Sequence, residues 1–116
     1  MSTILGIGTD ICHIPRIEAA YKRFGPKFLE RVLAPSEREG HWGPRQLARR
    51  WAIKEAVAKA TGQGIGMAVS FHDIVVTRDD KGKPHCTVNG YESHLVHVST
   101  SDDGEYASAY AIIEKL

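Results

Sequence analysis

The sequence predicts an α+β fold in which one long helix packs on a mainly antiparallel sheet. Strong helix formers run without a break over residues 45–61, which predicts the helix. After residue 70 the chain alternates short runs of β-branched residues with turns, which predicts the sheet. With 116 residues and 42% hydrophobic content, the chain has the size of one domain with one core. We therefore expect residues 1–116 to form a single domain.

The first predicted element is a short strand over residues 3–10. Gly6 and Gly8 within it indicate that another part of the backbone approaches closely, because neither residue carries a side chain. Asp10 follows the apolar residues, at the expected end of the strand. We therefore expect a carboxylate where the chain leaves the sheet.

Short helices are predicted next. Apolar residues recur at helical spacing over residues 14–24, and Gly25 ends that segment. A second short helix is expected to carry Phe28 and Val32. A third is expected to begin with Ser36 as its N-cap, because Glu39 stands three residues later, as in a capping box.

The long helix and the strands after it complete the prediction. Small side chains recur every four residues along the helix and form a stripe that permits close packing, at Ala48, Ala52, Ala56 and Ala60. Gly62 suits the left-handed position that ends many helices. Two hairpins are expected beyond it, the first from strands 71–78 and 85–88 and the second from strands 95–100 and 106–113.

Charge is distributed unevenly along the chain. Residues 1–60 hold eleven Lys and Arg against six Asp and Glu, whereas residues 61–116 hold four against eight. Five basic residues lie close together, at Arg16, Lys22, Arg23, Lys27 and Arg31. This cluster favours an acidic partner, although a solvated helix face would carry the same charges. We do not expect nucleic acid binding, because the net charge is only +1 and aromatic residues are not interleaved with the basic ones.

The sequence also bears on location. No stretch approaches the roughly 20 apolar residues that a membrane span needs. Residues 1–10 have no basic region of the kind that begins a signal peptide. We therefore expect a cytoplasmic protein that does not enter a membrane, with Cys12 and Cys86 as free thiols.

Asp10 and Glu55 are the candidate catalytic pair. Each has an ordinary structural explanation: a strand-end aspartate often shapes a turn, and Glu55 with Lys59 has the spacing of a surface ion pair on a helix. If the helix packs on the strand, however, the two carboxylates would meet and offer hard oxygen ligands to Mg²⁺. None of the six histidines has zinc-site spacing. The residues therefore indicate a magnesium site that receives phosphate oxygens.

Several motifs in a fixed order carry a family resemblance. They are 6–11 (GIGTDI) with Arg16, 28–31 (FLER) with 36–37 (SE), 50–64 (RWAIKEAVAKATGQG), 71–74 (FHDI), 82–84 (GKP), 96–99 (VHVS) and 105–107 (EYA). This order and spacing resemble the holo-[acyl-carrier-protein] synthases, the short type of 4′-phosphopantetheinyl transferase. The resemblance covers nearly the whole chain.

The resemblance implies roles for the site residues. Asp10 and Glu55 would hold Mg²⁺ together with the pyrophosphate of coenzyme A, and Lys59 would neutralise charge on the phosphates. Gly62 and Gly64 match the loop at which the backbone approaches the cofactor. These are the residues on which catalysis and binding would depend.

The resemblance also implies partners. Arg50 matches a residue associated with the 3′-phosphate of coenzyme A, and Arg16 and Arg23 match positions that dock the acidic helix of an apo-acyl carrier protein. The implied reaction moves phosphopantetheine from coenzyme A to a serine of that carrier and releases adenosine 3′,5′-bisphosphate. The family implies a homotrimer with active sites at subunit interfaces.

Some positions depart from the family pattern. Trp51 stands where phenylalanine is usual, and Gln63 replaces a common threonine or serine. Residues 99–103 lack the histidine that many members carry, and residues 84–96 leave no room for an additional helix. Two other functions remain open from the residues alone: a metal-dependent nucleotide pyrophosphate hydrolase, and a non-catalytic module that binds coenzyme A or a carrier protein.

Overall fold

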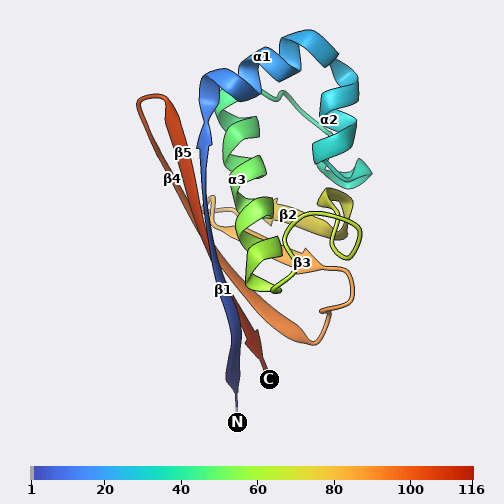
Figure 1. Cartoon of the computed structure of the whole chain (residues 1–116), viewed down its shortest axis with the longest axis vertical. Helices are drawn as coiled ribbons and strands as arrows, with labels where there is room; N and C mark the ends of the chain where they lie inside the picture. Colours follow the sequence, from blue (N-terminus) through green and yellow to red (C-terminus); the bar gives the residue numbers. More distant parts are fainter. Residues whose placement is uncertain (1) are drawn as a thin grey trace.

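The computed structural model describes residues 2–116 and leaves out Met1. The elements, in chain order, are β1 (Thr3–His13), α1 (Ile14–Phe24), α2 (Pro26–Val32), the 3₁₀ turn η1 (Pro35–Glu37), α3 (Pro44–Ala60), the 3₁₀ turn η2 (Phe71–Asp73), β2 (Ile74–Arg78), β3 (Pro84–Val88), β4 (His94–Asp103) and β5 (Tyr106–Lys115). The α+β class is confirmed, with one long helix beside antiparallel sheet (Figure 1).

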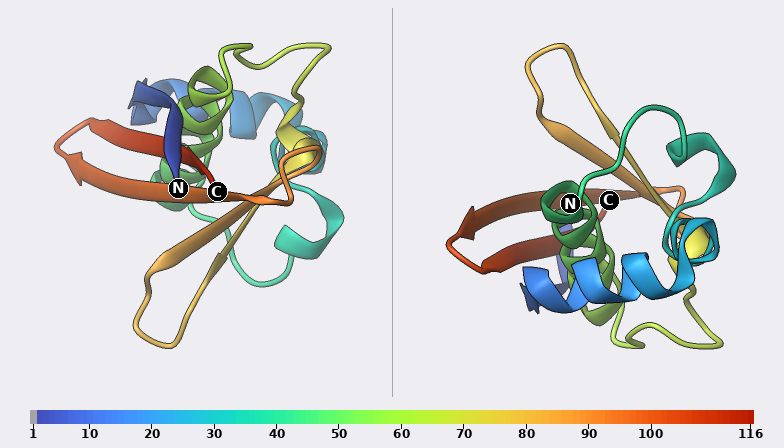
Figure 2. Two further views of the ribbon diagram at one scale, coloured as in Figure 1. Left: turned by 90° about the horizontal axis from the view of Figure 1, so that it is seen from below. Right: turned by 90° about the horizontal axis from the view of Figure 1, so that it is seen from above.

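The strands form two sheets. A three-stranded sheet has the order β1-β5-β4, and β2 pairs with β3 in a separate two-stranded sheet. All pairs are antiparallel, and β1 joins the C-terminal hairpin in a register that places Thr3 opposite Lys115 and His13 opposite Tyr106. The two hairpins project in different directions from the body of the molecule (Figure 2). The first strand of the chain therefore completes the sheet that the last two strands begin.

The packing of α3 on β1 explains the two strand glycines. A Cβ atom built on Gly6 would lie 2.1 Å from the carbonyl oxygen of Ala60, and one on Gly8 would lie 1.9 Å from that of Ala56. Both distances are far below van der Waals contact, so only glycine permits this approach. The predicted close approach and the alanine stripe are thus confirmed as two sides of one contact.

Three predicted boundaries were wrong. β1 continues past Asp10 to His13, because Asp10 pairs with Ala109 and the ladder to β5 goes on to His13. Residues 71–73 form η2 rather than the start of a strand. β4 continues beyond residue 100, the predicted end of the strand, to Asp103. Each of these ends is set by pairing or packing with distant residues, which local propensity does not register.

The predicted Ser36 cap was also wrong. The chain forms only the 3₁₀ turn Pro35–Glu37 here, and Ala34 occupies the N-cap position. The backbone N–H of Ala34 donates to Oε1 of Glu37 at 2.8 Å. Glu37 therefore takes the place in this turn that the sequence pattern assigned to Glu39.

The core surrounds α3: one side of the helix lies against the three-stranded sheet, and the rest of the core is filled by α1, α2 and the β2–β3 sheet. Alternate residues of β5, from Ala107 to Ile113, are buried there beneath the helix. On the opposite face the side chains of Ile7, Ile11 and Tyr110 are 72%, 69% and 65% exposed. One face of the sheet is thus covered by α3 and the other is apolar and open.

Among residues 2–116 there is no helix with the length and apolar character needed to cross a membrane.

Candidate functional site

The contact between α3 and β1 brings Asp10, Lys59 and Glu55 together. Nζ of Lys59 lies 3.3 Å from Oδ1 of Asp10 and donates a hydrogen bond to the carbonyl oxygen of Thr9 at 3.0 Å. Glu55 stands one helical turn before Lys59 on α3, and its pKa is raised by burial and then by the charge of Asp10. The predicted meeting of the strand carboxylate and the helix carboxylate is supported by this geometry.

The ion pair of Lys59 differs from the simplest expectation. Helical spacing favoured a pair between Lys59 and Glu55, but among the described residues the partner of Lys59 within 4.0 Å is Asp10. The lysine therefore ties the end of α3 to β1. Its side chain is half exposed, so it can also face a ligand from solvent.

The two carboxyl groups sit in an unfavourable environment for charge. Burial raises the pKa of Asp10, against the lowering effect of Lys59 and Arg16. Burial also raises the pKa of Glu55, and the neighbouring Asp10 raises it further. Oδ2 of Asp10 is buried and accepts no hydrogen bond from the described residues. An anionic oxygen without a donor is costly, so the pair is suited to receive a cation.

This donor set fits magnesium. Mg²⁺ is commonly held by one or two carboxylates, with water and substrate phosphates as its other ligands. Within residues 2–116 no group of three or more His, Cys, Asp or Glu side chains is arranged to hold a metal. Asp10 and Glu55 would therefore supply the protein ligands, and the other positions would be left to water and phosphate.

Gly62 and Gly64 end α3 in the left-handed region, with φ of 86° and 68°. The predicted left-handed Gly62 is thus confirmed. Their N–H groups are already used, because Gly62 donates to Lys59 O at 2.9 Å and Gly64 donates to Ala58 O at 3.0 Å. The two glycines therefore offer space for close approach rather than free donors.

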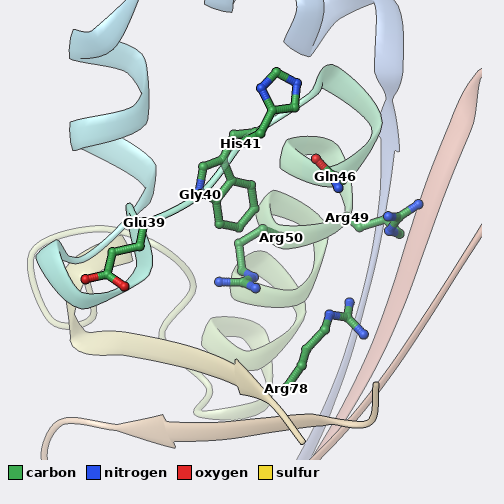
Figure 3. Close-up of a pocket in the computed structure, with 8 residues that line it drawn as sticks. Glu39, Gly40, His41, Gln46, Arg49, Arg50 and Arg78 are labelled. Atoms are coloured by element: carbon green, nitrogen blue, oxygen red, sulfur yellow. The ribbon is translucent and has the colours of Figure 1, made fainter. Parts of the chain in front are cut away.

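Arg50 lies elsewhere. It stands five positions before Glu55 on α3, and five positions on a helix correspond to about 140° of rotation and roughly 7.5 Å of rise. Arg50 instead lines a cleft of about 270 Å³ together with Arg49 of α3 and Arg78 of β2. Figure 3 shows the three arginine side chains entering this cleft, with His41 near its upper rim. We name Arg49, Arg50 and Arg78 the arginine cluster.

The arginine cluster is electrostatically strained. Burial, and then repulsion from Arg50 and Arg49, lowers the pKa of Arg78. Arg49 donates to Asp102 at 3.0 Å, and Asp102 also accepts from Arg45 at 2.6 Å. One carboxylate thus attaches the β4–β5 hairpin to α3. Arg50 pairs with Glu37, and Glu39 also lines the cleft. Within the described residues, Arg78 is the member of the cluster without a carboxylate within 4.0 Å. An anion in the cleft would offset its charge.

Sequence reasoning missed Lys54 and did not assign a role to Glu37. Lys54 is fully buried, donates to Val32 O at 2.8 Å and to Phe71 O at 3.0 Å, and forms an ion pair with Glu37. Arg50 and Lys54 stand four residues apart and therefore on one side of α3, which was the available signal. A solvated helix face gives the same spacing.

Arg16 and Arg23 lie exposed on α1, seven residues apart. The charge of Arg16 reaches the site, since it lowers the pKa of Asp10. Arg23 lies over the exposed ring of Phe24 at 5.2 Å. The other three members of the basic cluster, Lys22, Lys27 and Arg31, are also exposed. A basic helical surface therefore stands beside the carboxylate pair.

Comparisons with known proteins give a consistent result. A family model described as the 4′-phosphopantetheinyl transferase superfamily matches residues 6–111. The chain is 44% identical to a holo-[acyl-carrier-protein] synthase of Aliivibrio salmonicida, across 96% of this chain and 98% of the relative. It is 41% identical to the synthase of the same name from Vibrio cholerae, across 97% and 98%.

Solved structures agree. A holo-(acyl-carrier-protein) synthase from Bacillus anthracis, in complex with CoA (3′,5′-ADP), superposes with a TM-score of 0.87 at 42% identity over 97% of this chain and 98% of that one. The Helicobacter pylori enzyme in complex with coenzyme A gives 0.81 at 36% identity, over 92% and 98%. Because a family model and full-length relatives match almost the whole chain, it belongs to the 4′-phosphopantetheinyl transferase superfamily and, within it, to the holo-[acyl-carrier-protein] synthases.

Proposed function

We propose that this enzyme transfers 4′-phosphopantetheine from coenzyme A to a serine of an apo-acyl carrier protein and releases adenosine 3′,5′-bisphosphate. The reaction would depend on Mg²⁺ and serve fatty acid biosynthesis in the cytoplasm. One observation carries the proposal: the buried, donor-less Oδ2 of Asp10 lies in a carboxylate pair beside Lys59 and the basic α1 surface. The names of the relatives and the coenzyme A complexes of the solved structures support it.

Asp10 and Glu55 would hold the magnesium ion. When bound, the ion would act as a Lewis acid and orient the pyrophosphate of coenzyme A. It would also remove the repulsion that raises the pKa of Glu55. Lys59 would add a second positive charge near the phosphates, because its side chain is half exposed and its amino group lies next to Asp10.

The chemistry left to the side chains is proton transfer and positioning. The serine oxygen of the carrier attacks the β-phosphorus of coenzyme A, so that a new O–P bond forms there and the bond from that phosphorus to the bridging oxygen breaks. The bridging oxygen leaves with adenosine 3′,5′-bisphosphate. The serine proton passes to Glu55, or to Asp10 through a water.

The arginine cluster is the proposed site of the 3′-phosphate. Its cleft holds three guanidinium groups, which suit a phosphate dianion. Arg50 and Glu55 face different sides of α3, so coenzyme A would have to extend around the helix or reach from one copy of the chain to the next. The second arrangement agrees with the homotrimer that we propose.

The open face of the three-stranded sheet supports the homotrimer. Exposed Ile7, Tyr110 and Ile112 line a hollow of about 460 Å³, and Lys59 borders the same hollow. Apolar patches of this kind on a small domain commonly mark an interface. Contact between copies at this face would place a second chain beside the carboxylate pair.

One assay tests the proposal. The protein is incubated with coenzyme A, Mg²⁺ and an apo-acyl carrier protein, and the carrier is weighed by mass spectrometry. We expect a gain of one phosphopantetheine on the serine, which a serine-to-alanine carrier does not show. No gain with several carriers would refute the proposal. Release of adenosine 3′,5′-bisphosphate without a carrier would instead indicate the pyrophosphate hydrolase.

A further inference from the structure

Glu37 is the most highly connected buried side chain outside the carboxylate pair. Its Oε2 accepts from Nη1 of Arg50 at 2.7 Å and from the backbone N–H of Val76 at 3.1 Å. Its Oε1 accepts from the backbone N–H of Ala34 at 2.8 Å and pairs with Lys54. One carboxylate, with no exposed side-chain surface, therefore joins η1, α3 and β2.

These contacts fix how Arg50 meets the cleft. Both hydrogen bonds that its guanidinium makes within the described residues use Nη1, to Glu37 and to Val76 O at 3.1 Å. Trp42 covers one side of the group, with its ring centre 4.8 Å from Cζ. The guanidinium is planar and rigid, so holding one nitrogen and one face fixes the other two nitrogens. The side chain is 10% exposed, and it lines the cleft.

We propose that Glu37 is a positioning residue for the 3′-phosphate of coenzyme A: it holds Arg50 so that the free edge of the guanidinium faces the arginine cleft. The inference rests on the proposed function only in taking Arg50 as a 3′-phosphate contact. Glu37 does not touch the substrate. It acts through Arg50, and its removal should cost recognition of that one phosphate.

The two cations that Glu37 binds respond differently to its loss. Burial lowers the pKa of Lys54, so without a counter-charge this amine can become neutral and stay buried. Arginine cannot lose its proton in a protein. Without Glu37, Arg50 would be an unpaired buried cation and would turn toward solvent or another acceptor. The change should therefore act on Arg50 more than on Lys54.

The test compares binding of coenzyme A with binding of 3′-dephospho-coenzyme A, by calorimetry in the presence of Mg²⁺. The wild-type chain should prefer coenzyme A by about 10- to 100-fold, the range for hydrogen bonds to charged groups. Glu37→Gln keeps the size of the side chain and should reduce this preference to about threefold or less. Its affinity for 3′-dephospho-coenzyme A should stay within about threefold of wild type, since the rest of the ligand is unaffected.

Lys54→Met is the matched control. It removes the second cation that pairs with Glu37 in the same buried network but leaves the Glu37–Arg50 pair in place. It should lower the melting temperature while keeping the wild-type preference for coenzyme A. A preference retained by Glu37→Gln, or lost equally in Lys54→Met, would overturn the positioning role and leave a purely structural one.

Arg50→Lys decides the question if either variant fails to fold. Lysine keeps the positive charge but lacks the planar guanidinium with its several N–H groups. An ammonium that pairs with Glu37 therefore leaves no further nitrogen to face the cleft. Loss of the preference would support the contact between Arg50 and the 3′-phosphate through which Glu37 acts, and an undiminished preference would overturn the proposal. If wild type shows no preference, Arg50 is not a 3′-phosphate contact and the inference fails, whereas transfer to the carrier is tested separately. Conversely, if the wild-type chain prefers coenzyme A over 3′-dephospho-coenzyme A but transfers nothing to the carrier, the proposed function is refuted and the role of Glu37 still stands.

Discussion

Asp10 carries the least satisfied polar atom in the described chain. Its Oδ2 is buried without a donor, while Oδ1 faces Lys59. A buried acceptor without a partner costs roughly 1–3 kcal/mol, and an ionised one costs more. Folded proteins retain such groups mainly where function requires them. At the scale of single residues, Asp10 lies inside β1 rather than in a turn, and its buried oxygen agrees with the ligand role that we propose.

Glu55→Gln should abolish transfer without harming the fold. The amide cannot act as an anionic ligand or accept the serine proton, so we expect activity to fall by about 100-fold or more. Stability should be unchanged or slightly higher, because burial and Asp10 both oppose the charge on Glu55. Carrier mass spectrometry and a thermal melt measure the two effects. Glu92→Gln, on an exposed loop, is the control, and equal activity in both variants would remove Glu55 from the site.

Arg16→Glu tests the docking surface. The substitution reverses an exposed charge on α1, so the KM for the acidic carrier should rise by about tenfold, and the KM for coenzyme A should change less. Lys115→Glu is the control, because Thr3 pairs with Lys115 at the end of β1 far from α1. Steady-state kinetics with each substrate varied in turn gives both constants. Equal increases for carrier and coenzyme A would contradict a docking role.

At the scale of elements, α3 uses different sides for different tasks. Its alanine stripe packs on β1, Glu55 and Lys59 face the strand carboxylate, and Arg50 and Lys54 face Glu37. The position of the helix along β1 therefore sets both candidate sites at once. A shift of α3 away from Gly8 would separate Lys59 from Asp10 and also disturb the arginine cluster.

Gly8→Ala should therefore damage stability and activity together. The added methyl group would lie 1.9 Å from Ala56 O, and the overlap can be relieved only by moving backbone. We expect a loss of about 1–3 kcal/mol in the free energy of unfolding, or more. Chemical denaturation measures it. Gly66→Ala meets nothing within 4 Å and should be nearly neutral; a similar loss there would show that the contact with α3 is not the cause.

At the scale of the whole molecule, the three-stranded sheet is covered on only one face. Isoleucines of β1 and a tyrosine of β5 stand exposed on the other, near Lys59. A chain this short gains comparatively little from its own core, so covering this face with further copies would add stability. It would also exclude water from one side of the carboxylate pair, where charge neutralisation is most effective.

Ile7→Lys should convert the proposed homotrimer to monomers. The side chain is 72% exposed in the single chain, so the substitution leaves the core intact but places a charge in the apolar face. Light scattering gives the molar mass, and transfer activity should fall with it. Met67→Lys replaces an apolar residue that is even more exposed, next to Gly66, and should change neither. A wild-type monomer, or a trimeric Ile7→Lys variant, would place the interface elsewhere.

Much of this fold could be predicted because its signals are local. Gly6 and Gly8 marked a close approach, the alanine stripe marked the face that makes it, and Gly62 marked the helix end. The predicted Ser36 cap failed for the opposite reason. A capping pattern describes neighbours in sequence, whereas Glu37 is fixed by α3 and β2, which lie 13 to 39 residues away.

By itself, the sequence determined the α+β class and the order of the long helix and the strands, because hydrophobic period and glycines are properties of neighbouring residues. It also nominated Asp10 and Glu55 as the pair that we propose for magnesium. Only the tertiary structure decided that Lys59 pairs with Asp10 rather than Glu55, that Asp102 holds two arginines, and that Lys54 is buried. These contacts join residues far apart in the chain, and burial sets their energies. Neither quantity exists until the helix lies on the sheet.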